Sequence, residues 1–421
     1  MARVVLCAWG SYGDLFPYIG IALELKRRGH RPLLAHSEFY RTLVEGLGLE
    51  FHAVPPDIDP QDKAFIALAL STQGPKVLFS RIAASVRESY AAIDAACGDA
   101  DLVVTHPATP AAPLVAQKRG LPWVSTVLAP ISFLSAYELP LFPPYWLAHL
   151  YRRLGPGFAG AIVKAGKWTT TRWVAPVQAL RAELGLPPAP NPIFDGQFSP
   201  LRTLALFPRV LAEPQPDWPA NVDRTGFVSY SGPDEMPTPL VEFLDAGPPP
   251  VVFTLGTSAV GLPGTFFEES AKACELAGVR GVLLVGRYDA ERPTNLPSGV
   301  IAVDYAPHAE LFPRAAAIVH QCGMGTLSQA LRAGKPQLAV PFANDQPDNA
   351  DRVNRLGVAR VCYPGRYGSS RVAAHLRELL DRAQYGTSAK AIGLTVSRED
   401  GATAACNALE EVLRSSIRRP S

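Results

Sequence analysis

Five residues in the second half of the chain, Cys322–Thr326, form a glycine-containing segment whose composition suits a diphosphate. Gly323 and Gly325 would let the backbone approach an anion closely, because glycine has no side chain to obstruct it. A helix is expected to begin near Thr326, and the free backbone N–H groups at its start would hold the phosphates. A Gly-x-Gly pair before a helix is also common in proteins that bind no phosphate, so this segment alone does not establish a site.

A second polar segment, Asn344–Asn349, follows at a short distance along the chain. Asp345 offers acceptor oxygens and Gln346 offers both a donor and an acceptor, which suits adjacent sugar hydroxyls. A turn of this composition usually lies in solvent, but its spacing from the glycine-containing segment favours a shared ligand. Together the two segments indicate a site for a sugar attached to a diphosphate.

The elements around these segments are expected to form a β-α-β-α unit. Ala316–His320 is an apolar run typical of a buried strand, and Leu327–Leu331 has the periodicity of a helix that Gly334 ends. Leu338–Val340 is a second apolar run, and Pro341 opens the polar loop before another helix. In such units both loops leave the carboxyl ends of neighbouring parallel strands and face one crevice.

These motifs resemble those of the UDP-glycosyltransferase superfamily, the family 1 glycosyltransferases. The resemblance is strongest to the bacterial branch that contains the rhamnosyltransferase chain of rhamnolipid synthesis, and it extends to sterol and macrolide glycosyltransferases. It covers essentially the whole chain and is weakest between about Pro55 and Phe198. The motifs that carry it are Asp304–His308, His320–Thr326, Gln329–Leu331 with Gly334, Pro336–Leu338, Pro341-Phe342, and Asp345-Gln346 with Asn349.

The resemblance implies an α/β architecture of the GT-B type, with two facing doubly wound Rossmann-like domains. We expect an acceptor-binding domain over residues 1–232, a nucleotide-sugar-binding domain over residues 238–400, and a C-terminal helix over residues 401–421 that packs across both. The Pro- and Gly-containing segment Ser231–Pro237 is the best linker in the chain. Arg202–Leu206 and Thr225–Val228 are expected to be the last strands of the first domain.

The resemblance also implies how the donor is held. Tyr305 occupies the position whose aromatic ring stacks on the nucleotide base, and Thr257-Ser258, in a loop, occupy a position that touches the donor. Two positions depart from the family, because Gln321 stands where many relatives have a phosphate-contacting His and Gln329 where they have a ribose-binding Glu. The full implied donor set is Ser11, Gly13, Thr257, Ser258, Tyr305, Ala306, His308, His320, Gln321, Gly323, Met324, Gly325, Thr326, Gln329, Asp345 and Gln346.

Asp14 is the candidate for the catalytic base. It follows the buried strand Val4–Ala8 in a tight loop, where its position alone fits a helix N-cap as well as a catalytic role. The resemblance favours catalysis, because Gly13–Pro17 is similar to the family segment whose His or Asp takes the acceptor proton. A carboxylate at a helix N-terminus is stabilised as the anion, so the bound acceptor would have to desolvate it.

The acceptor is expected to contact two further regions of the first domain. His106 follows the strand Leu102–Val104 and, by the resemblance, is a candidate for the acceptor site, although a lone His is commonly a structural hydrogen bonder. Pro130–Pro144 is apolar, aromatic and interrupted by proline. It either packs under a long connection or forms a lipophilic acceptor pocket. The residues expected to line that pocket are Phe133, Tyr137, Leu141, Phe142 and Trp146.

Composition supports a small-molecule enzyme with no cofactor. The chain has 421 residues, 48% of them hydrophobic, and 40 basic residues balance 38 acidic ones, so nucleic acid is not an expected partner. Six scattered cysteines indicate reduced thiols and a cytoplasmic location. Neither Asp57-Ile58-Asp59 nor Asp99-Ala100-Asp101 is placed to hold a diphosphate-bound metal. No apolar run is long enough to span a membrane, while peripheral membrane association and the oligomeric state stay open.

The leading hypothesis is an inverting glycosyltransferase that moves a sugar from a UDP- or dTDP-sugar to a hydroxyl of a lipophilic acceptor. The acceptor would be a natural product, a polyphenol or a hydroxy fatty acid. One alternative is a catalytically silent nucleotide-sugar-binding helper protein, against which the presence of Asp345-Gln346 and of the glycine-containing segment argues. Another is an epimerase or hydrolase on the same fold. A nicotinamide dehydrogenase is disfavoured, because the segment Gly10–Asp14 lacks the G-x-G-x-x-G fingerprint.

Overall fold

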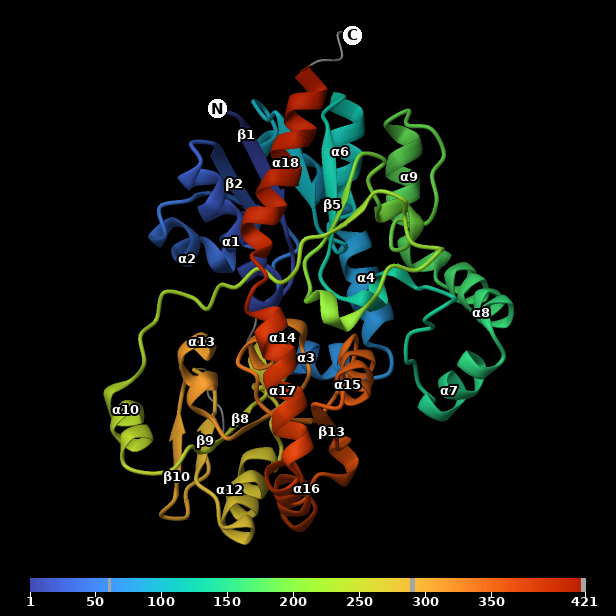
Figure 1. The fold of residues 1–421 in the computed structure, drawn as a ribbon. Coiled ribbons are helices and arrows are strands. Elements are labelled where there is room, and N and C mark those ends of the chain that lie inside the picture. Colours follow the sequence, from blue (N-terminus) through green and yellow to red (C-terminus); the bar gives the residue numbers. More distant parts are fainter. Residues whose placement is uncertain (60–61, 288–291, 418–421) are drawn as a thin grey trace. The chain divides into compact units, whose positions relative to one another are not determined.

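The computed structural model describes residues 1–59, 62–287 and 292–417, except for the side chains of Thr257, Ser258 and Ile417 (Figure 1). The chain divides into two compact units. Unit 1 consists of Met1–Asp59, Gln73–Tyr230 and Asp400–Ser421, and unit 2 consists of Pro60–Thr72 and Ser231–Glu399. A short segment from the N-terminal half, including helix α3 (Lys63–Ala69), is therefore part of unit 2.

Each unit is built around one parallel sheet, which confirms the expected doubly wound α/β architecture. The sheet of unit 1 has seven strands in the order β3-β2-β1-β4-β5-β6-β7, and that of unit 2 has six in the order β10-β9-β8-β11-β12-β13. The strands of unit 1 are β1 (Arg3–Cys7), β2 (Arg31–His36), β3 (Glu50–Ala53), β4 (Leu102–Thr105), β5 (Trp123–Val127), β6 (Thr203–Ala205) and β7 (Val222–Arg224). Those of unit 2 are β8 (Val251–Thr254), β9 (Gly281–Leu284), β10 (Val300–Val303), β11 (Ala317–His320), β12 (Gln337–Ala339) and β13 (Ala359–Val361).

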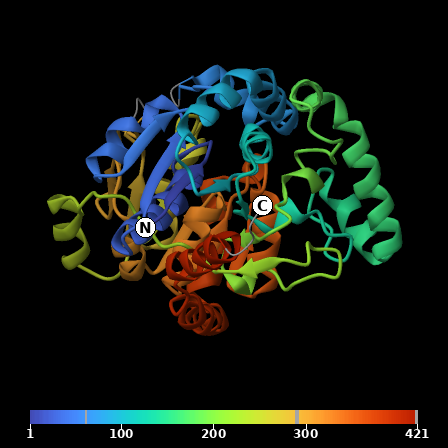
Figure 2. The same ribbon diagram turned by 90° about the horizontal axis from the view of Figure 1, so that it is seen from above.

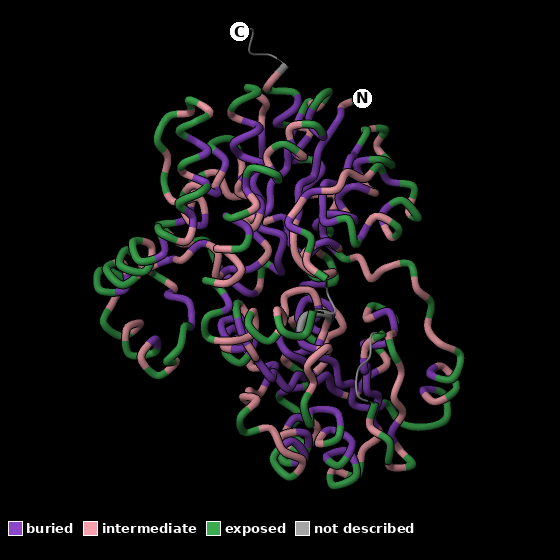
Figure 3. The backbone as a smooth tube through the Cα atoms, turned by 180° about the vertical axis from the view of Figure 1, so that it is seen from behind, coloured by how far each residue is buried: buried purple, intermediate pink, exposed green. Residues whose placement is uncertain are grey.

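Helices cover both faces of each sheet, because side chains alternate between the faces of a buried strand. In β1, Val4 and Leu6 join a core with α1 and α18, whereas Val5 and Cys7 join a second core with α5 and α6. Figure 3 shows the buried strands at the centre of each unit. The helices of unit 1 are α1 (Tyr12–Arg27), α2 (Arg41–Gly46), α4 (Gly74–Ala84), α5 (Val86–Ala96), α6 (Ala111–Arg119), α7 (Tyr145–Arg153), α8 (Pro156–Thr169), α9 (Ala175–Glu183) and α18 (Gly401–Ile417).

The helices of unit 2 place the expected β-α-β-α unit on one edge of its sheet. Helix α14 (Met324–Arg332) follows β11 after a short loop, and α15 (Gln346–Arg355) begins after the loop that follows β12. Besides α3, the helices of unit 2 are α10 (Thr238–Asp245), α11 (Gly256–Ala259), α12 (Phe266–Ala277), α13 (His308–Leu311), α14 (Met324–Arg332), α15 (Gln346–Arg355), α16 (Ser369–Asp381) and α17 (Ala383–Val396). In the part of the chain that the structure describes, no helix is long and apolar enough to cross a membrane.

Three expectations about local structure are corrected. Thr225–Val228 is not a strand: β7 ends at Arg224, and Phe227 and Val228 are buried beside α1 and α18 without joining the sheet. The polar segment Asn344–Asn349 is not a loop throughout, because α15 begins at Gln346, with Pro347 in the first turn, where its missing N–H costs nothing. Thr257-Ser258 fall in the single helical turn α11 rather than in a loop.

The C-terminal helix α18 completes the core of unit 1. Its side chains Ala405, Cys406 and Leu409 are fully buried in the same core as the inner face of α1. Arg28 at the end of α1 donates to Glu410 (3.2 Å) and to Asn407 (2.7 Å) of α18. Residues far apart in the sequence thus form one layer over the sheet.

The packing of α18 predicts the effect of a cavity in that layer. Leu409→Ala removes a fully buried side chain and should lower the free energy of opening of the α1 amides by roughly 2–5 kcal/mol. Hydrogen exchange of α1 peptides measures this directly, which is preferable in a two-unit protein that need not unfold in one step. The control is Leu394→Ala on α17, whose side chain is 56% exposed. Equal effects of the two substitutions would show that α18 is not part of this core.

Candidate active site

Asp14 lies in the first turn of α1, where it shares a capping box with Ser11. Ser11 is the N-cap residue: its Oγ accepts from the backbone N–H of Gly13 (3.3 Å), and its own N–H donates to Asp14 Oδ2 (2.8 Å). Asp14 is therefore the third residue of the helix rather than its N-cap. The preceding turn requires glycine, because Gly10 has φ +133° and a Cβ there would lie 2.2 Å from Asp14 Oδ2.

His106 is the residue that faces the other oxygen of Asp14. It follows β4, which pairs with β1, and its Nε2 is 3.6 Å from Asp14 Oδ1. Its Nδ1 accepts from the backbone N–H of Ala108 (3.0 Å), so the neutral ring carries its proton on Nε2, toward the carboxylate. The His106 side chain is 7% exposed and that of Asp14 is 36% exposed. The arrangement leaves Asp14 accessible and supported from behind by an imidazole.

A third polar group, His36, was not among the expected site residues. It ends β2, the other neighbour of β1, and is fully buried. Burial lowers the pKa of His36 to about 3 against the opposing effect of the Asp14 carboxylate, so the ring is neutral near physiological pH. Its Nδ1 accepts from the Ser37 N–H (2.8 Å). The signal that sequence reasoning missed is a histidine at the carboxyl end of the strand beside β1.

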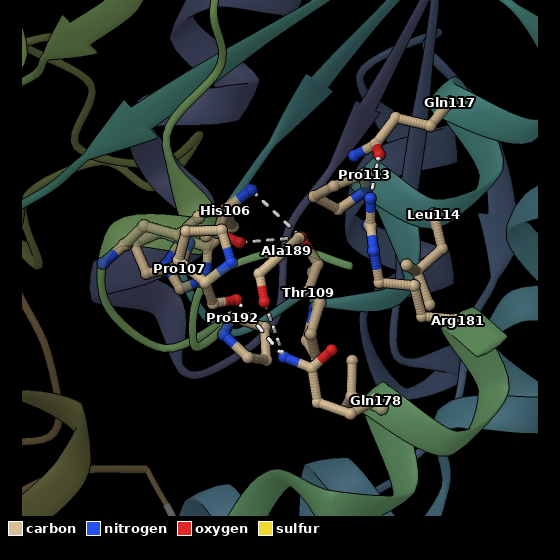
Figure 4. A pocket seen from close by; sticks show the side chains of 15 residues that line it. His106, Pro107, Thr109, Pro113, Leu114, Gln117, Gln178, Arg181, Ala189 and Pro192 are labelled. Carbon is tan, nitrogen blue, oxygen red and sulfur yellow. Dashed lines mark hydrogen bonds between the residues drawn. The ribbon is translucent and has the colours of Figure 1, made fainter. Parts of the chain in front are cut away.

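The small cavity beside His106 is not an acceptor pocket. Figure 4 shows it lined by side chains from α6 and α9 and from the loop that follows α9, including Arg181, which donates to Gln117 (2.8 Å). Its volume is about 20 Å³. That is room for a single water molecule.

The other expected acceptor residues differ in how far they are buried. Phe133 is 6% exposed and stacks on Trp218, with ring centroids 4.0 Å apart. Tyr137 is 54% exposed and Phe142 is 42% exposed. The apolar segment is thus divided between packing and surface: Phe133 takes the packing role that the sequence left as an alternative, whereas Tyr137 and Phe142 stay accessible.

In unit 2, the glycine-containing segment ends in the first turn of α14, where backbone N–H groups have no hydrogen-bond acceptor among the described residues. Gly323 is the N-cap of α14, and it has no side chain to cap the helix. Among the described residues, no acceptor is bonded to the backbone N–H groups of Met324, Gly325 and Thr326. Cys322 precedes them with φ +65°, a left-handed conformation that costs a non-glycine residue roughly 1–2 kcal/mol. The result is three consecutive N–H groups oriented for an anion.

Of the two polar residues before this segment, Gln321 lies at the loops and His320 lies in the core. The His320 ring is fully buried: Nδ1 accepts from the Cys322 N–H (3.1 Å) and Nε2 pairs with Gln337 Oε1 (2.9 Å). Burial lowers the pKa of His320 to about 4. Strand alternation explains the difference, because successive side chains point to opposite sides. His320 therefore has no ring nitrogen left for a diphosphate, contrary to its place in the expected donor set.

The Gln321 amide lies between the ends of β8 and β11. A Cβ on Gly256, after β8, would lie 2.0 Å from Gln321 Nε2, and one on Gly323 would lie 3.0 Å from it. Gln321 is 3% exposed, and its Oε1 has no hydrogen-bond partner among the described residues. Such an unpaired buried group is costly unless a ligand or water completes it.

The side-chain amide of Asn349 joins the glycine-containing segment to the polar segment Asn344–Asn349. Asn349 Nδ2 donates both to the backbone oxygen of Cys322 (2.9 Å) and to Asp345 Oδ2 (2.7 Å), and Asn349 is fully buried. Gln346 Oε1 accepts from the N–H groups of Phe342 (2.8 Å) and Ala343 (3.2 Å), which orients its NH₂ group as the remaining donor. Asn349 belonged to the motif but not to the expected site. Its spacing of four residues from Asp345 on one helix is the signal.

Ser231 of the linker joins the two residues expected at the base and ribose. Tyr305 donates from its hydroxyl to the Ser231 oxygen (2.7 Å), and Gln329 Nε2 donates to Ser231 Oγ (3.0 Å). The guanidinium of Arg287, a residue that the sequence did not single out, lies 4.6 Å from the Tyr305 ring centroid and pairs with Asp234 (2.7 Å). One face of the Tyr305 ring is therefore occupied by a cation.

The remaining expected donor residues fall in different places. Ala306 is fully buried, and the His308 ring stacks on Phe312 with centroids 4.4 Å apart, while burial lowers the pKa of His308 to about 4. Ser11 and Gly13 lie in unit 1, whereas all other members of the set lie in unit 2. The side chains of Thr257 and Ser258 lie outside the described residues. Within the described residues, no group of three or more His, Cys, Asp or Glu side chains could hold a metal ion.

Both halves of the chain match known protein families. Residues 281–407 match the C-terminal domain of proteins similar to erythromycin biosynthesis protein CIII, and residues 4–116 match the N-terminal domain of glycosyltransferase family 28. The chain is 32% identical over 430 residues to O-mycaminosyltylonolide 6-deoxyallosyltransferase of Streptomyces fradiae, with 97% of each chain covered. It is 27% identical over 419 residues to a sterol 3-beta-glucosyltransferase of Leptosphaeria maculans, covering 94% of this chain and 28% of that protein.

Among solved structures, the spinosyn rhamnosyltransferase SpnG complexed with thymidine diphosphate shares the fold, with a TM-score of 0.70 at 17% identity over 97% of this chain and 100% of that chain. The match to the Streptomyces fradiae enzyme spans nearly the whole of both chains. We conclude that this chain belongs to the glycosyltransferases of the GT-B fold, related to macrolide and sterol glycosyltransferases, and is an enzyme of the hexosyltransferase type.

Proposed function

We propose that this enzyme transfers a sugar, with inversion, from a UDP- or dTDP-sugar to a hydroxyl group of a lipophilic small molecule. The observation that carries the proposal is the Asn349 bridge, which holds three free N–H groups beside Asp345. A nucleoside-diphosphate sugar requires N–H groups that donate hydrogen bonds to its phosphates, and beside them an acceptor for the hydroxyl groups of its sugar. We assign donor recognition to unit 2 and acceptor recognition to unit 1.

On the donor side, the N–H groups of Met324–Thr326 bind the diphosphate and stabilise the negative charge that develops as it leaves. Preorganised backbone dipoles at a helix start do this without reorientation during the reaction. The amide of Gln321, whose Oε1 is unpaired, completes its hydrogen bonds with the bound donor. Asp345 and the NH₂ group of Gln346 bind sugar hydroxyls and so orient the anomeric carbon.

On the acceptor side, Asp14 takes the proton of the attacking hydroxyl. Oδ2 is committed to the capping box, and Oδ1 faces His106, whose Nε2–H stabilises the carboxylate in place. The proton passes to Asp14 as the acceptor oxygen bonds to the anomeric carbon. The leaving diphosphate departs from the opposite face, which inverts the configuration.

The donor and acceptor classes rest on the relatives. SpnG is described as a rhamnosyltransferase in complex with thymidine diphosphate, and the curated relatives act as a 6-deoxyallosyltransferase and a sterol glucosyltransferase. These names favour a dTDP-deoxysugar or an activated glucose as the donor, and a natural product such as a macrolide or a sterol as the acceptor. Polyphenols and hydroxy fatty acids stay acceptor candidates from the sequence. All six cysteines are free and buried, which favours a reducing compartment such as the cytoplasm.

A transfer assay tests the proposal directly. The protein is incubated without added metal with UDP-glucose and dTDP-rhamnose in parallel, together with macrolide, polyphenol and hydroxy-fatty-acid acceptors. Mass spectrometry should show an acceptor heavier by one hexose or one deoxyhexose. Donor hydrolysis or epimerisation without transfer would instead support the epimerase or hydrolase alternative, and donor binding without any turnover would support the helper protein.

The base assignment predicts the behaviour of Asp14→Asn. Asparagine can still accept from the Ser11 N–H, so the helix cap is retained, but the proton acceptor is lost. We expect kcat to fall by about 10²–10⁴ with an unchanged Kd for the nucleotide sugar. Asp99→Asn, at a carboxylate that is 60% exposed, is the control. A variant that transfers at the wild-type rate would remove Asp14 from the mechanism.

The bridge predicts a defect in donor binding for Asn349→Ala. Losing both hydrogen bonds should separate the glycine-containing segment from Asp345 and weaken UDP and dTDP binding about tenfold or more, as measured by calorimetry. Asn407→Ala, at an exposed position of α18, is the matched control. Circular dichroism checks that the variant is folded. Unchanged nucleotide affinity in a folded Asn349→Ala protein would show that the bridge does not organise the donor site.

A further inference from the structure

Helices α7 and α8 expose a cluster of large apolar side chains, which we name the α7–α8 surface. Its members are Trp146, Leu150, Leu154, Phe158, Ile162 and Trp168. Trp146 is 69% exposed and Trp168 is 79% exposed. With Tyr137 and Phe142, these residues make up eight of the fourteen exposed large hydrophobic side chains in the described part of the chain. Single exposed apolar side chains scattered over a protein surface are ordinary, whereas a cluster of them marks an interaction surface.

The α7–α8 surface is not the inner face of an ordinary packed helix pair. Trp146 and Leu150 are four residues apart on α7, and Phe158 and Ile162 are four apart on α8, so each pair shares a helix face. The rings of Tyr151 and Phe158, 5.2 Å apart, join the two helices. Among the described residues, each helix buries a single side chain, an alanine. Figures 1 and 2 show α7 and α8 at the outer edge of unit 1, and Figure 3 shows them largely exposed.

The charged residues carried by α7 and α8 themselves are all basic. No Asp or Glu occurs in the sequence between Glu138 and Glu183. Lys167 pairs with Asp195 (2.6 Å), but among the described residues no carboxylate is paired with Arg153, Lys164 or Arg172, which are exposed. Exposed tryptophan, phenylalanine and leucine flanked by uncompensated cations is the composition of helices that lie in a membrane interface.

We propose that the α7–α8 surface docks this enzyme on an anionic lipid bilayer. The apolar side chains enter the boundary between headgroups and acyl chains, and Arg153, Lys164 and Arg172 contact anionic headgroups. A bilayer fits better than a protein partner, because tryptophan prefers the membrane–water interface and the cations are spread along both helices instead of gathering at one point. The proposal does not depend on the acceptor, although a lipophilic acceptor would be concentrated at the same bilayer.

Vesicle flotation tests the proposal with the full-length protein and no substrate, so its result is independent of the proposed function. The protein is mixed with vesicles of phosphatidylcholine alone or of phosphatidylcholine with phosphatidylglycerol, at low and at high salt. We expect flotation with the anionic vesicles, weakened by salt because screening reduces the electrostatic part. Flotation that is equal with both vesicle types, or absent from both, would overturn the proposal.

Two double variants assign the binding to this surface. Ile162→Ser with Trp168→Ser should lower the bound fraction at least tenfold, and Arg153→Gln with Lys164→Gln should weaken binding about fivefold for each cation removed. The controls are Leu276→Ser, at a 49% exposed side chain on α12, and Lys63→Gln with Lys76→Gln on α3 and α4. Melting curves confirm that each variant is folded. Flotation that survives both test variants would place the contact elsewhere.

The main alternative to a bilayer is a second copy of this chain bound to the α7–α8 surface. Light scattering after size-exclusion chromatography tests it by measuring the molar mass of the protein in solution. A second copy of this chain would give a dimer that the Ile162→Ser, Trp168→Ser variant dissociates. Such a dimer, together with a lack of flotation, would overturn the proposal in favour of self-association. A monomer that floats with anionic vesicles supports the bilayer.

Discussion

The candidate donor site in unit 2 depends on one buried amide. Asn349 Nδ2 bonds to the backbone oxygen of Cys322 and to the carboxylate of Asp345, and so joins the loops after β11 and β12. Parallel topology brings those loops to one edge of the sheet, but it does not set their separation to the accuracy that chemistry needs. The side chain of Asn349 does so, because its two donors have a set geometry. The left-handed Cys322 is held by the same bond.

In unit 1, one carboxylate makes two contacts. Asp14 closes the capping box of α1 with one oxygen and meets His106 with the other. The capping bond to the Ser11 N–H fixes the position of the carboxylate at the start of α1. Gly10 makes the arrangement possible, since any side chain there would collide with Asp14. Both units thus place candidate site groups at helix starts: backbone N–H groups at the start of α14 in unit 2, and a carboxylate at the start of α1 in unit 1.

The region between β5 and β6 shows how apolar residues are divided in a single segment. Phe133 stacks on Trp218 in the interior, whereas Tyr137, Phe142 and the apolar side chains of α7 and α8 face outward. An exposed apolar surface that carries basic and no acidic residues interacts poorly with water and suits the interface of an anionic lipid bilayer. The enzyme therefore carries its lipophilic character on its surface as well as in its core.

From the sequence alone, apolar periodicity and motif spacing indicated the strands and helices of the β-α-β-α unit, and the resemblance of its motifs to the UDP-glycosyltransferases indicated the two doubly wound domains and the family. The periodicity is a local signal, because it separates strands from helices within a short stretch of chain. The sequence did not determine that Thr225–Val228 stays outside the sheet, that His320 points into the core while Gln321 points to the loops, or that α3 belongs to unit 2. Strand pairing and domain membership were decided by contacts between residues distant in the chain, which no local pattern encodes. Strand alternation separates the directions of His320 and Gln321, but only the tertiary structure shows which of the two faces the core.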